Sequence, residues 1–80
     1  MSEIEVKSAL ERWVVSNVRD QAVSDVPYDH DMITNRVVDS LRFADFILYV
    51  EELSARTIDL ETLDLSQFRT INAIYQAFFT

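Results

Sequence analysis

Several residue types that shape small folds are missing or rare in this chain of 80 residues. It has no cysteine, which excludes disulfides and thiolate metal sites and suits the cytoplasm. It has no glycine and a single proline, Pro27, so the usual turn signals of β-hairpins are absent. No apolar run approaches the roughly 20 residues that a membrane-spanning helix needs, and the acidic N-terminus lacks the pattern of a signal peptide. These absences predict a cytoplasmic protein with little β-structure.

The charge of the chain is strongly negative. Its 14 acidic residues outnumber its 7 basic ones and give a net charge of −7. Nucleic acids and anionic membranes would be repelled, so we expect neither as a partner, whereas basic protein surfaces would be attracted. Because 49% of the residues are hydrophobic, the chain can bury a modest core. We therefore expect residues 1–80 to form a single domain, as a monomer.

The first predicted helix runs from about Ser2 to Asn17. Ser2 and Glu5 have the spacing of a capping box, in which each side chain bonds the backbone N–H of the other residue. Apolar residues recur behind this cap at helical spacing and predict a core face: Val6, Leu10, Trp13 and Val14.

Residues 19–38 lose this periodicity and predict a long loop, rich in Ser, Asp and Asn. Five apolar residues are expected to pin it onto the helices: Val23, Val26, Tyr28, Met32 and Ile33. The loop also holds Asp25, Asp29, His30 and Asp31. It lacks the glycine and the final glutamate of an EF-hand, so we expect a solvated loop and no metal site.

The second predicted helix starts at Asp39 or Ser40 and ends near Ser54. Asp39 is a good N-cap, and its charge is favourable at the positive end of a helix. One face of this helix is apolar and predicts the core side: Phe43, Phe46, Ile47, Val50 and Leu53. A second stripe lies on roughly the opposite side: Leu41, Asp45, Leu48 and Glu52.

The C-terminal part predicts two further helical segments. Four apolar residues between Ile58 and Leu65 fit one or two helical turns that lie on the core. Thr70 is expected to cap a final helix whose apolar residues follow at helical spacing: Ile71, Ile74, Tyr75 and Phe78. No segment alternates as a β-strand does. The predicted fold is all-α, a small four-helix bundle of three main helices and one short helix.

Ser40 is the residue with the most chemical interest. It begins a long helix after a long polar stretch, and Asp39 can cap that helix, so the Ser40 hydroxyl is not needed there. A serine hydrolase would need a base within reach and an oxyanion site, but the only histidine is His30 and no glycine-based loop exists. Ser40 is therefore interpreted as an acceptor that another enzyme modifies, and the chain itself as no enzyme.

The residues around Ser40 also form a pattern known from one family. The segment that runs from Asp39 to Leu53, DSLRFADFILYVEEL, resembles the phosphopantetheine-attachment segment of acyl carrier proteins. In that family an Asp-Ser-Leu triplet begins the second helix, and its serine carries the prosthetic arm. The resemblance covers about Met32 to Phe78, and FRTINAI, which begins at Phe68, resembles the final capping turn and helix of the family.

The resemblance implies a cofactor and partners. It implies 4'-phosphopantetheine bound covalently to Ser40, flanked by Asp39 and Leu41, whose thiol holds an acyl or aminoacyl group as a thioester. The implied partners are a phosphopantetheinyl transferase, an acyl or aminoacyl ligase or transferase, and downstream biosynthetic enzymes. Aligned on Ser40, five residues fall in the partner-recognition patch of the family: Arg42, Asp45, Leu48, Glu51 and Glu52.

The chain departs from the family at two places. The glycine common before Asp-Ser-Leu is replaced by Arg36 or Val37, depending on the alignment. Arg42 stands where many carriers have an acidic or neutral residue, which puts a positive charge into the recognition patch. A second interpretation of the same residues is an unmodified acidic helical adaptor. Such an adaptor would bind a basic protein surface through the stripe on the second helix.

Overall fold

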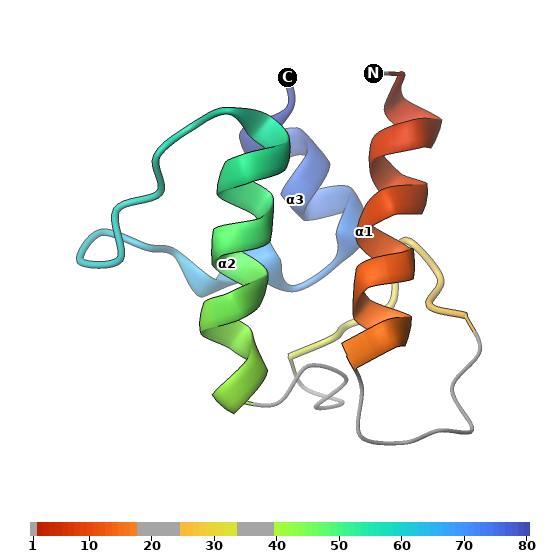
Figure 1. Ribbon diagram of the computed structural model, residues 1–80, viewed down its shortest axis with the longest axis horizontal. Coiled ribbons are helices and arrows are strands. Elements are labelled where there is room, and N and C mark those ends of the chain that lie inside the picture. The colour runs from red at the N-terminus through yellow and green to blue at the C-terminus, as the bar shows by residue number, and fades with distance from the viewer. Residues whose placement is uncertain (1, 18–24, 34–39) are drawn as a thin grey trace.

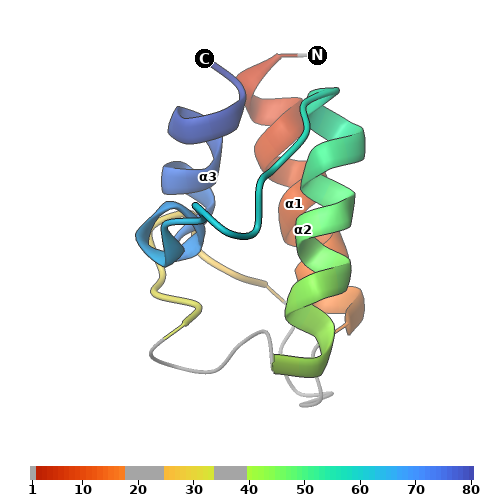
Figure 2. The same ribbon diagram turned by 90° about the vertical axis from the view of Figure 1, so that its left-hand side faces the viewer.

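Three α-helices make up most of the fold. The structure, a computed structural model, describes residues 2–17, 25–33 and 40–80, without the side chains of Ser40 and Leu41. Over these residues it contains α1 (Glu3–Asn17), α2 (Ser40–Ser54), a short 3-10 helix η1 (Leu65–Phe68) and α3 (Ile71–Phe78), and no strand. Helices α1 and α2 run antiparallel, and α3 packs against α1 (Figure 1; Figure 2). Within the described residues, no helix combines the length and hydrophobicity needed to cross a bilayer.

Helix α1 begins as its sequence predicts. The Glu5 N–H donates to Ser2 Oγ (3.2 Å), and the Ser2 N–H donates to Glu5 Oε1 (3.5 Å). This reciprocal pair satisfies N–H groups that the first turn of a helix leaves without a partner. The predicted core face is confirmed: Val6, Leu10 and Val14 are buried, and Trp13 is half-buried.

Helix α2 has the predicted bounds and the predicted core face. Phe46, Ile47 and Val50 are buried, while Phe43 and Leu53 are partly buried and pack against the core. The Phe46 ring stacks on Trp13 of α1, with 4.9 Å between the ring centroids. This contact joins the middle of α2 to the C-terminal part of α1.

Helix α3 packs against the core and contributes two buried residues to it. Thr70 is its N-cap, as predicted, and its Oγ1 accepts a hydrogen bond of 2.9 Å from the Ala73 N–H. Ile71 and Ile74 are fully buried. Tyr75 and Phe78 of this helix, and Phe79 directly after it, are partly buried against the same core.

The prediction of a helix between Ile58 and Leu65 is wrong. The residues there form turns, and the only helical element nearby is η1, which starts at Leu65. Asp59 Oδ1 accepts from the Glu61 N–H (2.9 Å), and Asp64 caps η1 by accepting from the Ser66 N–H (3.0 Å). Aspartates that bond nearby backbone in this way compete with the helical ladder. The described fold is thus a small helical bundle of three α-helices and one 3-10 turn, not four helices.

The described part of the loop between α1 and α2 is anchored at several points. The Val26 N–H donates to Glu11 Oε2 on α1 (2.9 Å), and the Met32 N–H donates to the carbonyl oxygen of Arg69 (2.7 Å). Arg69 also pairs with Asp31 at 3.1 Å. The predicted apolar anchors are confirmed where they are described: Val26 and Met32 are buried, and Tyr28 and Ile33 pack on the core. Val23 lies outside the described residues.

Candidate functional site

Ser40 is the first residue of α2, in agreement with the sequence prediction. The predicted cap, Asp39, lies outside the described residues, and so do the side chains of Ser40 and Leu41. The first N–H groups of a helix have no acceptor within the helix, and together they give its start a partial positive charge. The backbone around Ser40 is therefore suited to a negatively charged group.

The outward face of α2 carries the predicted stripe. Asp45, Leu48 and Glu52 are all exposed, and 59% of Leu48 is accessible to water. Asp45 and Glu52 are about 10 Å apart along the helix axis and face the same way, with Leu48 between them. An apolar side chain between two carboxylates can contact a partner, while the carboxylates attract basic groups on it.

Glu51 has a bond within the fold that the sequence did not indicate. Its Oε2 accepts a hydrogen bond of 2.8 Å from the Ile58 N–H, and Glu51 is only partly exposed. This carboxylate fixes the chain where it leaves α2. A role for Glu51 in partner recognition stays a prediction. Its hydrogen bond to Ile58 holds the segment that follows α2 against the end of the helix.

Arg42, the other predicted recognition residue, is exposed in the first turn of α2. Its position adds a positive charge near the start of the helix. Elsewhere in the chain, hydrogen bonds from the Ser66 side chain and then its backbone stabilise the ionised form of Asp64 and lower the pKa of that carboxyl.

The acidic residues and His30 of the loop before α2 do not gather into a candidate metal site within the described residues. No group of three or more potential ligands of the types His, Cys, Asp and Glu comes together among the described residues. His30 lies in a turn in which its backbone N–H donates to the carbonyl oxygen of Pro27 (3.0 Å). This agrees with the interpretation of Asp25, Asp29, His30 and Asp31 as loop residues.

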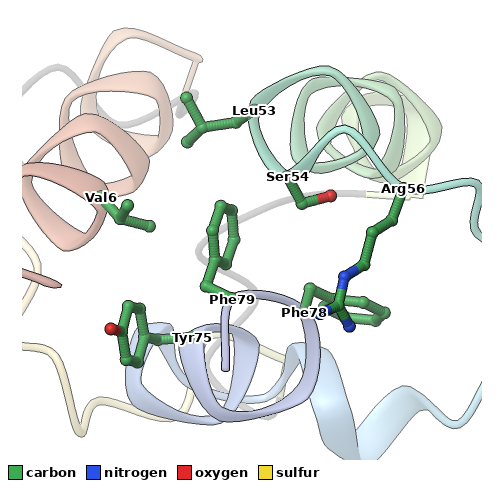
Figure 3. Close-up of a pocket in the computed structure, with 7 residues that line it drawn as sticks. All are labelled: Val6, Leu53, Ser54, Arg56, Tyr75, Phe78 and Phe79. Carbon is green, nitrogen blue, oxygen red and sulfur yellow. The ribbon is translucent and has the colours of Figure 1, made fainter. Parts of the chain in front are cut away.

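A small open cleft lies at the other end of α2, about 20 Å along the helix from Ser40. Its volume is about 230 Å³, and Figure 3 shows the Phe79 ring pointing into the space between Leu53 and Tyr75. The cleft was not predicted, because the periodicity of α3 assigns its aromatic residues to the core. Its lining comes from all three helices and the turn after α2: Val6, Leu53, Ser54, Arg56, Tyr75, Phe78 and Phe79.

Comparisons with known proteins add no family to this description. No protein-family model matches the chain, and no curated protein matches it significantly. The resemblance around Ser40 therefore stays a prediction that rests on the residues and the fold described above.

Proposed function

We propose that this chain is a free-standing acyl or aminoacyl carrier protein that is modified at Ser40. The observation that carries the proposal is the joint placement of two features on one helix. Helix α2 begins at the serine of Asp39-Ser40-Leu41, and its outward face exposes Leu48 between Asp45 and Glu52. An acceptor at one end and a docking face along the same helix are what a partner enzyme needs in order to find the hydroxyl.

The residues present fit a phosphopantetheine arm. A phosphodiester on Ser40 would lie at the positive end of α2, where backbone N–H groups lack helical acceptors and favour an anion. The exposed guanidinium of Arg42, two residues further on, adds positive charge close to that position. When bound, the arm supplies the thiol that the chain lacks, and this thiol holds acyl groups as thioesters.

The protein itself would contribute attachment and recognition. Asp45 and Glu52 would attract a basic partner, and Leu48 would make the apolar contact once the two surfaces meet. Once docked, the tethered intermediate would be present at a high effective concentration at the active site of the partner. The carrier would therefore be a substrate of its partners and not a catalyst.

The direct test is modification of the intact protein. Co-expression with a broad-specificity phosphopantetheinyl transferase should add the mass of one phosphopantetheine to the wild type and none to Ser40→Ala. Ser40→Ala should keep the helical circular dichroism and melting temperature of the wild type, because the substitution lies at a helix end and alanine is a good helix former. Modification that persists in Ser40→Ala would assign the arm to another residue. An unmodified wild type would leave the acidic adaptor, bound to a basic partner through the α2 stripe, as the better interpretation.

A further inference from the structure

A second exposed surface lies on the connection that leads from α2 into η1. Four large apolar side chains are exposed among the described residues, and two of them, Leu60 (65%) and Leu65 (55%), lie in the short segment 59–65. This segment passes beside α2 on the side away from α1 (Figure 1; Figure 2). We infer that it is a docking surface for a basic amphipathic helix of a partner protein, with Leu60 and Leu65 as its apolar contacts.

The segment is held in one shape before any partner binds. Ile58 and Phe68, on either side of it, are buried in the core, and the Ile58 N–H donates to Glu51 Oε2 (2.8 Å). Within the segment, Asp59 and Asp64 each accept a hydrogen bond from the backbone N–H two residues ahead. Because this backbone is already ordered, little conformational entropy is lost when a partner covers it.

The two leucines form an apolar contact area on this ordered segment. Leu63, between them, packs partly against the core and so fixes the segment on the bundle. A single exposed leucine is ordinary on a protein surface, but neighbouring ones on a loop held by a rigid scaffold are typical of a binding site. By chain length, the Cα atoms of Leu60 and Leu65 lie within about 18 Å of each other. A helix of about 12 residues spans that distance.

The charge around these leucines is negative. Residues 57–68 include Asp59, Glu61 and Asp64, all of them exposed, and no lysine, arginine or histidine. Within the described residues the Glu61 carboxylate forms no ion pair, so it is available to a cationic partner. An apolar contact beside carboxylates is complementary to a surface that carries leucine-like side chains beside lysines or arginines.

The arginines that flank the segment do not reverse this charge. Arg69, on one side, pairs with Asp31 at 3.1 Å. Arg56, on the other side, lines one groove together with Glu51 and Glu52, and these carboxylates offset its charge. The potential over the segment is therefore negative, and a cationic partner is attracted to it.

The negative charge decides between possible occupants. Nucleic acids and anionic membranes would be repelled, and a second copy of this chain would bring like charges together. A basic amphipathic helix meets both requirements, because its apolar side covers the leucines while its cations pair with the carboxylates. This surface does not depend on modification of Ser40. Its partner is separate from the modifying enzyme, which is expected at Asp45, Leu48 and Glu52.

The probe is a blocked helix of leucine and lysine, about 15 residues long, with its leucines along one side. A matched helix has glutamates in place of the lysines. Binding is followed by the NMR chemical shift of the Leu63 backbone amide, because Leu63 lies between the two contacts and is unchanged in every variant. At about 0.15 M salt, the lysine helix should shift this amide saturably and the glutamate helix should not.

Two pairs of variants test the apolar contacts. Leu60→Ser with Leu65→Ser should weaken binding of the lysine helix by about tenfold or more. Ile4→Ser with Leu48→Ser removes two equally large apolar side chains that are exposed elsewhere, and it should alter binding less than about twofold. All four side chains are exposed, so neither pair should unfold the protein, which circular dichroism checks.

Two single variants test the charge. Glu61→Lys should weaken binding of the lysine helix by about threefold or more. Asp25→Lys makes the same charge change at an exposed carboxylate outside the segment and should alter binding less than about twofold. Ser40→Ala should bind the lysine helix as the wild type does, whether or not Ser40 is ever modified, so this test is separate from that of the carrier function.

Several outcomes would overturn a docking role for residues 59–65. The lysine helix would give no saturable shift at Leu63, or both helices would act alike. The control pair Ile4→Ser with Leu48→Ser would weaken binding as much as Leu60→Ser with Leu65→Ser, or Asp25→Lys as much as Glu61→Lys. A wild type that sediments as a dimer, and that Leu60→Ser with Leu65→Ser dissociates, would make the occupant a second copy of this chain.

Discussion

At the scale of single residues, Ala55 shows how this glycine-free chain ends a helix. Ala55 follows the last residue of α2 and has φ 57°, in the left-handed region that glycine normally occupies. The Arg56 N–H then donates to the carbonyl oxygen of Glu51 (3.3 Å), as in a Schellman motif. A left-handed conformation costs an alanine roughly 1–2 kcal/mol because its Cβ crowds the following carbonyl group. The helix end is therefore less stable than it could be.

Ala55→Gly should raise the free energy of unfolding by about 0.5–1 kcal/mol. The gain is smaller than the strain that is removed, because glycine also makes the unfolded chain more flexible. Ala44→Gly is the matched control, since Ala44 is also exposed but lies inside α2, where glycine costs about 1 kcal/mol. Urea denaturation of both variants should show shifts of opposite sign. Shifts of the same sign would contradict the left-handed conformation at Ala55.

At the scale of elements, the sequence predicts the α-helices well because their signals are local. The capping box of Ser2 and Glu5 and the cap at Thr70 each involve residues within one turn, and each forms as expected. The apolar spacing from Ile58 to Leu65 predicts a helix, but it takes no account of side chains that bond the backbone in place of the helical hydrogen bonds. Asp59 and Asp64 bond the backbone two residues ahead, so that segment turns and leaves Leu60 65% exposed.

The two faces of α2 should respond very differently to alanine. Phe46 is 1% exposed and stacks on Trp13, so Phe46→Ala should cost about 3–5 kcal/mol in the free energy of unfolding. Leu48 is on the outward face, and Leu48→Ala should cost no more than about 0.5 kcal/mol. Denaturant titrations followed by circular dichroism compare the two. Similar losses would mean that Leu48 is buried and that the stripe faces the core.

At the scale of the whole molecule, several contacts join different elements or cross a turn, and no local pattern predicts them. Glu11 accepts from the Val26 N–H, and Glu51 accepts from the Ile58 N–H. The carbonyl oxygen of Arg69 likewise accepts from the backbone of the loop before α2. Such pairings depend on how the elements pack, so they appear only in three dimensions. They also show that some acidic residues hold the fold together, and that the charge of −7 is not all available to partners.

Whether partners sense the total charge or the α2 stripe can be decided with charge-matched variants. Asp45→Lys with Glu52→Lys reverses two exposed carboxylates on the stripe, and Asp25→Lys with Glu61→Lys reverses two exposed carboxylates elsewhere. Both pairs change the net charge equally. Neither should shift the melting temperature much, because exposed carboxylates contribute typically under about 1 kcal/mol each.

If the stripe docks the modifying enzyme, its local charges steer the encounter, and only the first pair should sharply slow phosphopantetheinylation at low salt. Added salt should then slow the wild type toward that variant. Equal slowing by both pairs would mean that the enzyme responds to net charge alone, and unchanged rates would leave the stripe without a role in docking.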